Sequence, residues 1–214
     1  MRGMRRVLRM VGTGLVIAIA FAAFAASAQA IEWSYEGKVL KEGEIKELPC
    51  SLEGSSQLET HVSGQLVKLN FTGVKCIGWK IQNKSGQAIS NGKLEFTGVT
   101  VLSPANCSGL SSLTTKSISG LALEEPKLGT GFGVRYVPEA GEETGWMTFE
   151  LTGASCPIKT TIIPKGSDVA EVFAEETMVQ PYKFNSTVQS LTGSTLHVGT
   201  ETAVLTGIVN FTFG

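Results

Sequence analysis

The chain has 214 residues, with 18 Lys or Arg, 19 Asp or Glu and 2 His, and a formal net charge of −1 at pH 7. This balance offers no basic surface to nucleic acid, which we therefore exclude as a partner. Two histidines and a single aspartate, Asp168, exclude a three-histidine or HExxH metal site and argue against carboxylate-dense calcium loops. We expect no metal and no cofactor.

The first thirty residues have the pattern of a secretory signal peptide. Four arginines precede an uncharged apolar stretch, Met10–Ala26, and Ala28-Gln29-Ala30 places small residues where signal peptidase requires them. We predict cleavage between Ala30 and Ile31, with cleavage after Ala28 as the nearest alternative. Residues 31–214 then form one extracytoplasmic domain with a net charge near −5, because the four arginines are lost from the formal −1. The sequence leaves open whether export uses the general secretory or the twin-arginine route.

Short runs of alternating apolar and polar residues recur after residue 31, separated by Gly, Ser, Asn and Pro, which is typical of β-strands. We predict an all-β domain, an antiparallel β-sandwich, with a short β-helix or barrel as the alternative. One segment, Val169–Thr177, is predicted as a helical turn. The expected strands, in chain order, are Ile31–Tyr35, Lys38–Leu48, Leu58–Val62, Gln65–Thr72, Ile77–Gln82, Lys93–Leu102, Ser117–Leu123, Gly133–Val137, Trp146–Leu151, Ile158–Ile163, Val179–Gln189, Thr195–Val198 and Ala203–Phe213.

One phrase in this strand region occurs twice. Lys68-Leu69-Asn70-Phe71-Thr72-Gly73-Val74 returns as Lys93-Leu94-Glu95-Phe96-Thr97-Gly98-Val99, and softer echoes stand at Leu151-Thr152-Gly153 and Leu205-Thr206-Gly207. Two good copies are too few for a solenoid, so we interpret them as equivalent strands. The glycine of each copy permits a bend or bulge before the next segment.

Four cysteines remain after the leader, and an even number in an exported chain predicts two disulfides. Their spacing contains no CxxC pair, which argues against zinc. The sequence allows three pairings. Among these we choose Cys76–Cys107 with Cys50–Cys156.

No catalytic constellation stands out. His61 and His197 lie on the polar phase of their strands, which predicts surface positions, and no Gly-x-Ser-x-Gly elbow provides a nucleophile. We therefore predict no catalytic and no cofactor-binding residues. A secreted glycoside hydrolase with paired glutamates stays as an alternative, since two carboxylates suffice for that chemistry. The acidic residues available to it are Glu124, Glu125, Glu142, Glu143, Glu150, Glu175 and Glu176.

Aromatic residues give the one positive indication of binding, although Trp and Tyr are mostly buried in β cores. In a strand, Met147, Phe149 and Leu151 share one face and Trp146 lies on the other. If the apolar face points inward, Trp146 points outward. We therefore choose Trp146 as the candidate for a surface contact, for example with polysaccharide.

Several phrases are similar to a group of uncharacterised exported β-proteins of high-GC Gram-positive (actinobacterial) soil bacteria. The phrases are Phe71-Thr72-Gly73-Val74-Lys75-Cys76, Leu113-Thr114-Thr115-Lys116 and Phe149-Glu150-Leu151-Thr152-Gly153-Ala154-Ser155-Cys156. The resemblance implies an exported β fold and no known activity. One departure is the second repeat copy, which ends without a cysteine.

These observations predict a non-catalytic protein that is secreted or held non-covalently at the cell envelope and acts by surface binding. No lipid-anchor cysteine, apolar C-terminal tail or membrane span after signal cleavage is expected. The expected partners are a cell-wall or extracellular polysaccharide or another surface protein. A carbohydrate-binding module and an adhesin or fibre subunit are the alternatives.

Overall fold

The computed structural model describes residues 31–172 and 178–213. The predicted signal peptide, including Ala30 of the cleavage site, lies outside this range, as do Glu175 and Glu176. The described residues are 59% strand and 6% helix, so the all-β prediction is confirmed. No helix in the described part of the chain is both long and apolar enough to cross a membrane.

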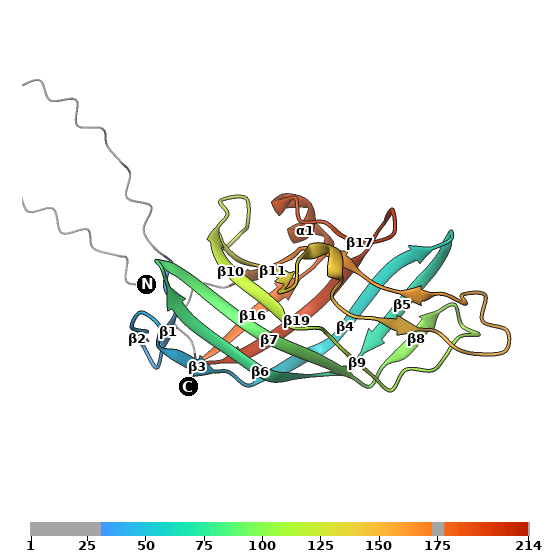
Figure 1. Ribbon diagram of the computed structural model, residues 1–214, viewed down its shortest axis with the longest axis horizontal. Helices are drawn as coiled ribbons and strands as arrows, with labels where there is room; N and C mark the ends of the chain where they lie inside the picture. The colour runs from blue at the N-terminus through green and yellow to red at the C-terminus, as the bar shows by residue number, and fades with distance from the viewer. Residues whose placement is uncertain (1–30, 173–177, 214) are drawn as a thin grey trace, which may run out of the picture.

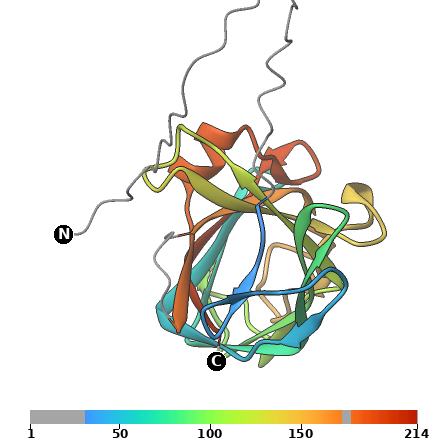
Figure 2. The same ribbon diagram turned by 90° about the vertical axis from the view of Figure 1, so that its left-hand side faces the viewer.

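A large antiparallel sheet curls on itself in a half-barrel or sandwich-like arrangement, as Figures 1 and 2 show. Its strands follow one another in space as β3 (Ile45–Glu47), β6 (Gly73–Lys84), β7 (Gln87–Thr97), β10 (Ile118–Glu124), β11 (Phe132–Pro138), β15 (Asp168–Val172), β16 (Val179–Phe184), β19 (Val204–Thr212), β4 (Cys50–Val62), β5 (Gln65–Phe71) and β8 (Thr100–Ser103). A further strand, β9 (Ser112–Thr114), pairs with the end of β7.

The repeated phrase forms two corners that pack on each other. β5 runs into β6 at Thr72 and β7 runs towards β8 at Gly98, so each copy carries the chain from one part of the curled sheet to another. Thr72 N donates to Thr97 O at 3.1 Å. A Cβ on Gly98 would lie 2.0 Å from Thr72 Oγ1, and one on Gly73 would lie 2.6 Å from Thr97 Oγ1. Each threonine therefore packs against the glycine of the other copy, and the predicted bends are confirmed.

A Thr-Gly pair also interrupts a strand at Leu205-Thr206-Gly207, the weaker copy of the repeated phrase in β19. The β19 ladder with β4 shifts register between Thr206 and Ile208, and Gly207 stands at the shift with φ 141°. Ser56 of β4 fills the space beside it, because its Oγ donates to Thr206 O at 2.6 Å. This is the bulge that a Thr-Gly phrase in a strand predicts.

Aromatic side chains fill the concave side of the curled sheet. Trp79 packs against Tyr136 and Phe211 at ring distances of 5.8 and 5.0 Å, and Tyr182 meets Phe211 edge-on at 4.6 Å. Phe184 lies 5.9 Å from Tyr136. Such contacts add to the stabilisation that burial of the rings provides. The core of the domain lies here, between strands that are far apart in the sequence.

Both cysteines of each predicted pair are bonded, but the predicted pairing is wrong. The disulfides are Cys50–Cys76 and Cys107–Cys156, with Cα–Cα distances of 5.5 and 4.7 Å. The curl of the sheet brings the start of β4 beside β6, and this long-range approach is not visible in the sequence. Ser108 and Thr152 exchange two backbone hydrogen bonds of 2.8 Å, which align the loops that carry the second bridge.

A buried asparagine fixes the N-terminal segment to the sheet. Asn83 of β6 accepts a hydrogen bond from Trp33 N at 2.6 Å and donates to Trp33 O and Leu40 O at 3.1 and 2.9 Å. This segment holds the small hairpin β1 (Ser34–Tyr35) and β2 (Lys38–Val39). Three bonds from one buried amide, together with the backbone bridge of Glu42 to Asn83, attach this segment to β6.

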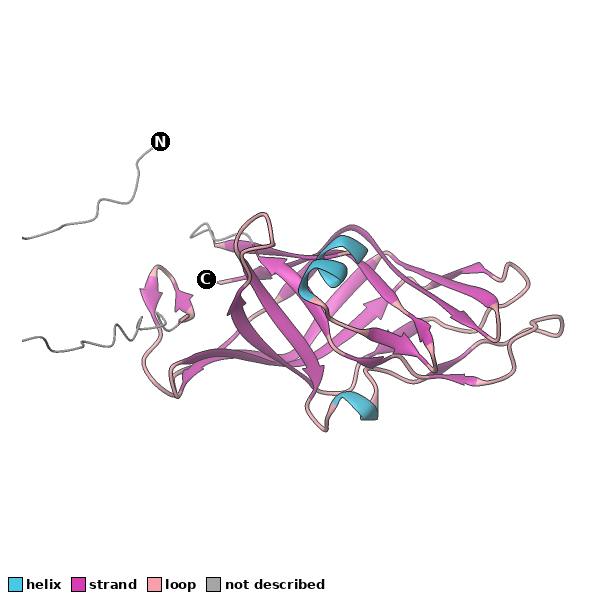
Figure 3. Ribbon diagram, turned by 90° about the horizontal axis from the view of Figure 1, so that it is seen from above, coloured by secondary structure: helices cyan, strands magenta, loops and turns pink. Residues whose placement is uncertain are grey.

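One α-helix, seen in Figure 3, stands where the sequence predicts a strand. The predicted strand Val179–Gln189 ends at Phe184, and α1 (Ser186–Thr192) follows. Asn185 caps the helix by accepting a hydrogen bond from Val188 N at 2.8 Å, and Gly193 ends it with φ 65°. An Asn cap and a left-handed Gly are ordinary helix-end signals, and the alternating pattern concealed them. The helical turn predicted from Val169 is wrong over Val169–Val172, which belong to β15.

The remaining elements are short. A 3-10 turn, η1 (Glu142–Thr144), lies between β11 and β12 in the sequence. Two small sheets complete the described structure: β12 (Phe149–Glu150) with β13 (Thr161–Ile162), and β14 (Lys165–Gly166) with β17 (Leu196–Val198) and β18 (Glu201–Thr202). The second of these sheets lies next to α1 and forms part of the candidate site.

Candidate functional site

A groove of about 550 Å³ lies between α1 and the β17–β18 hairpin. Figure 1 shows the elements that border it, α1 and β17, at the top of the molecule. Six of its eleven lining residues carry a hydroxyl group, and Leu196 and Val204 contribute apolar side chains. The hydroxyl-bearing residues are Ser186, Ser190, Ser194, Thr195, Thr200 and Thr202. No Lys, Arg, Asp or Glu belongs to the described lining, so the groove presents neutral hydrogen-bonding groups.

Two side chains of the groove are held in fixed positions. Gln189 Nε2 donates to Ala203 O at 3.0 Å, which ties α1 to the chain that leads into β19. His197 Nδ1 lies 2.9 Å from Gly199 O, and because a carbonyl only accepts, Nδ1 carries the proton. In the neutral ring Nε2 is then an acceptor. The groove thus combines hydroxyl groups that both donate and accept with one ring nitrogen that accepts.

The helix that forms one wall is seated on the outer side of β15. Val188 of α1 packs with Val169 of β15 and with Leu128, in a cluster separate from the main core. The loop that holds Leu128 is fixed to the same strand, since Thr130 N donates to Glu171 Oε1 at 3.2 Å. The position of the wall therefore depends on β15.

On its inner side, the same strand contributes Asp168 to a polar row, a line of buried residues that crosses four strands and contains three polar side chains. Ser90, Gly120, Tyr136 and Asp168 are register partners across β7, β10, β11 and β15. Ser90 is 2% exposed and both Tyr136 and Asp168 are 1% exposed. Ser90 Oγ, Tyr136 OH and Asp168 Oδ2 make no hydrogen bond with the described residues, although the Ser90 hydroxyl lies close enough to the Tyr136 hydroxyl to lower its pKa slightly. Buried polar atoms rarely lack a hydrogen-bond partner, so these three atoms lower the stability of the fold.

Burial dominates the protonation of the row. It raises the pKa of Asp168 to about 7, and the only opposing effect is the hydrogen bond of 2.9 Å that Val169 N donates to Asp168 Oδ1. Burial also raises the pKa of Tyr136 and of Tyr182, so both phenols stay neutral. Asp168 is therefore the one member of the row that changes charge near neutral pH.

Trp146, the predicted surface contact, is buried, and this prediction is wrong. The side chain is 2% exposed and its Nε1 donates to Gly166 O at 2.8 Å. The strand alternation that pointed it outward does not apply, because the strand covers only Phe149–Glu150 and the adjacent Met147 is buried as well. Trp33, Trp79, Tyr136 and Tyr182 are also in the core. Residues 31–172 and 178–213 thus show no exposed aromatic row of the kind that sugar stacking uses.

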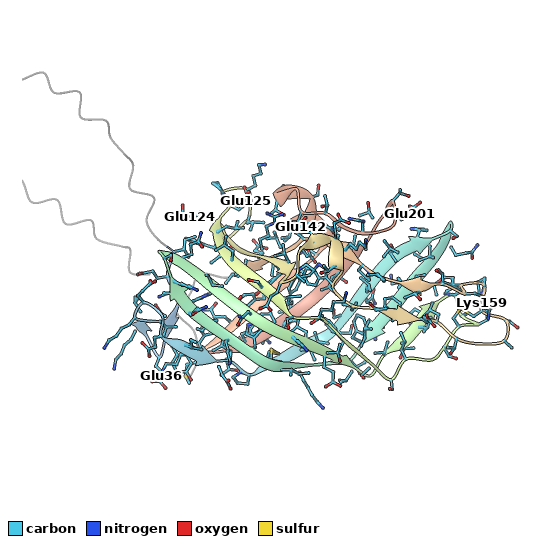
Figure 4. The ribbon with its side chains drawn as sticks, in the orientation of Figure 1. Glu36, Glu124, Glu125, Glu142, Lys159 and Glu201 are labelled. Atoms are coloured by element: carbon cyan, nitrogen blue, oxygen red, sulfur yellow. A yellow bond between two sulfur atoms is a disulfide. The ribbon has the colours of Figure 1, made fainter. Side chains whose placement is uncertain are left out.

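The histidines and glutamates considered in the sequence do not form a common site in the described structure. His61 is exposed on β4, in agreement with a surface position. Glu142 pairs with Arg135 at 2.7 Å and Glu143 with Lys165 at 3.5 Å. Figure 4 shows Glu124, Glu125, Glu142 and Glu201 on the same upper side as α1. No group of three or more His, Cys, Asp or Glu there is arranged to hold a metal ion.

Comparison of the chain with protein-family models, curated proteins and solved structures finds no significant match. The groove and the polar row therefore rest on the geometry of this chain alone. Neither was foreseen from the sequence. The one available signal was Asp168, a lone aspartate that begins the otherwise apolar run Val169-Ala170.

Proposed function

We propose that the protein is a non-catalytic, exported binding domain that takes an uncharged, hydroxyl-bearing ligand in the groove between α1 and the β17–β18 hairpin. The neutral, hydroxyl-rich lining of this groove is the observation that supports the proposal. Concave sites with a few placed polar groups over an apolar floor are the usual form of ligand sites in proteins.

The charges around the groove favour a neutral ligand over an acidic one. Glu201 lies between the lining residues Thr200 and Thr202 and is exposed. Its carboxylate repels an anionic chain, and the lining contains no Lys or Arg to compensate. Hydroxyl groups, by contrast, exchange hydrogen bonds with other hydroxyls. A neutral polysaccharide of the cell wall or the medium is the ligand that this chemistry fits best.

Two features support an extracytoplasmic location. The leader has the order of charge, apolar stretch and small residues that directs export. All four described cysteines form disulfide bonds, as is usual in oxidising compartments. We place the mature protein outside the cytoplasm, secreted or held non-covalently at the envelope.

The adhesin or fibre alternative ranks lower. It requires a sheet edge near a terminus that is open to a neighbouring molecule. The edge strand β3 is three residues long, and its charged residues Lys46 and Glu47 pair with Glu44 and Lys80. Short, charged edges are the features by which proteins prevent strand addition.

Titration followed by NMR tests the proposal. Neutral oligosaccharides, acidic oligosaccharides and an uncharged peptide are added in turn to the mature protein. We expect the amides of α1, β17 and β18 to shift with a neutral oligosaccharide and to respond less to the acidic one.

A matched pair of variants locates the site. Ser190 and Thr187 are both exposed residues of α1, but only Ser190 lines the groove. Ser190→Lys should abolish the shifts and Thr187→Lys should leave them. Binding that survives Ser190→Lys, or a panel with no neutral binder, contradicts the proposal.

A further inference from the structure

The strand β15 loses one of its two neighbours at the position of Asp168. β16 pairs with β15 at Glu171–Lys183 and Val172–Tyr182. Continued by two residues, this register would place Asn185 opposite Val169, but Asn185 is the cap of α1. The chain leaves the sheet there. The first half of β15 is thus paired with β11 on one side and covered by α1 from outside.

The Asp168 carboxyl stands at this weakened position with little to stabilise a negative charge. It is 1% exposed, one oxygen accepts only the neighbouring Val169 amide, and the other has no hydrogen-bond partner among the described residues. Its register partner on β11 is Tyr136, and β16 brings Tyr182 to the same core; both are neutral. Ionisation therefore places an unpaired charge inside the core, which is costly.

The charged groups near β15 lie elsewhere. Arg135 of β11 is opposite Val169 and pairs with Glu142, while Glu171 and Lys183 are opposite each other further along. α1 contains no charged residue. His197 is the one histidine in the described lining of the groove. No cation offsets the Asp168 carboxylate, since burial and the Val169 amide are the only influences on its pKa.

The strand connects this carboxyl to the groove over a short distance. Asp168 and Ala170 point to the core, and Val169 points outward to Val188 of α1. α1 in turn contributes Ser186, Gln189 and Ser190 to the groove. The Val169–Val188 contact thus joins the strand that carries Asp168 directly to the helix that borders the groove.

We propose that Asp168 is a proton-operated latch of the groove: the protonated carboxyl keeps β15 and α1 in place, and loss of the proton releases both. This proposal depends on the proposed function in one respect, namely that the groove is a binding site. The opening itself is a property of the protein without ligand.

Hydrogen exchange of the ligand-free mature protein between pH 5 and pH 8 tests the latch. After correction for the intrinsic pH dependence of exchange, protection of the β15 and α1 amides should fall by up to about tenfold per pH unit, or about 50-fold from pH 5 to pH 7. This follows from a carboxyl that holds its proton more tightly when closed than when open to water. Above pH 7 the loss should level off.

Two variants and one internal reference make the outcome decisive. Asp168→Asn should remove the pH dependence, and His197→Gln should retain it. Amides of the β4–β5 hairpin report global unfolding, which also exposes Asp168, so they should show the same slope but stay better protected than the amides of β15 and α1 at every pH. A flat wild-type profile, an unchanged slope in Asp168→Asn, loss of the slope in His197→Gln, or β15 and α1 amides as well protected as those of the β4–β5 hairpin overturns the latch.

The result is independent of whether a ligand is found. If the latch is present but no neutral oligosaccharide shifts the groove amides, the proposed ligand is wrong and the latch stands. If oligosaccharide binds with the same affinity at pH 5 and pH 8 and the exchange profile is flat, the latch is wrong and the proposed function stands.

Discussion

The two Thr-Gly corners predict a specific energetic coupling between residues of different repeat copies. Gly98 has φ +60°, and its missing Cβ would lie 2.0 Å from Thr72 Oγ1. Gly98→Ala should therefore incur two costs: about 1 to 2 kcal/mol for an L-residue in the left-handed region, and about 1 to 3 kcal/mol for the overpacked contact. Together these give a destabilisation of about 2 to 5 kcal/mol.

Gly64→Ala separates the two contributions. Gly64 has φ +76° at the tip between β4 and β5, and nothing lies within 4 Å of its Cβ position. It should show the backbone cost alone, about 1 to 2 kcal/mol. Thr72→Ala removes the colliding oxygen, so in that background Gly98→Ala should cost no more than Gly64→Ala. The double-mutant cycle then gives a coupling of about 1 to 3 kcal/mol.

Urea unfolding followed by tryptophan fluorescence measures these free energies, because Trp33, Trp79 and Trp146 are all buried. If Gly98→Ala and Gly64→Ala cost the same, Thr72 does not fill the corner as described. If Thr72→Ala fails to relieve Gly98→Ala, the reciprocal packing of the two copies is refuted.

Three further predictions concern global stability. Asp168 holds its proton up to about pH 7 in the fold and only to about pH 4 when unfolded, so the native state binds an extra proton between these values and stability falls as pH rises through them. The free energy of unfolding in urea should therefore fall by about 4 kcal/mol more for wild type than for Asp168→Asn between pH 4 and pH 8. The same pH dependence in both proteins would contradict this. Non-reducing peptide mapping should find Cys107 linked to Cys156, and a link from either cysteine to a different partner would refute the described pairing. Replacing both cysteines by Ala should lower the free energy of unfolding by about 4 kcal/mol, since the bridge spans 49 residues. Asn83→Ala leaves Trp33 N and Leu40 O without their Asn83 partner, while Trp33 O keeps Leu40 N, and should cost about 2 to 4 kcal/mol. A loss under 1 kcal/mol in thermal unfolding would show that the N-terminal segment is held by other contacts.

Much of the strand pattern was predictable because it is local. The alternation in Gln65–Phe71 and in much of Gln87–Thr97 follows directly from one buried and one less buried side of a strand. The Thr-Gly phrases likewise predicted bends from glycine alone. Their mutual packing was not predictable, since it depends on the two bends meeting in space.

The errors share one physical origin. Trp146, the cysteine pairs and α1 each depend on contacts between segments distant in the sequence. Trp146 is buried by Gly166 and its surroundings, and Cys50 meets Cys76 only after the sheet has curled. In α1, Val188 and Gln189 are the buried residues, and both are covered by tertiary neighbours. A seven-residue helix has too few turns to show a period of its own.

The reciprocal corners also constrain how the sequence can diverge. Each glycine leaves room for one atom of a threonine that stands in the other copy. A change at position 98 is therefore tolerated only with a smaller residue at position 72, and the same holds for positions 73 and 97. Among homologous sequences, these two pairs should covary across a separation of about 25 residues, and each glycine should vary independently of its own neighbouring threonine.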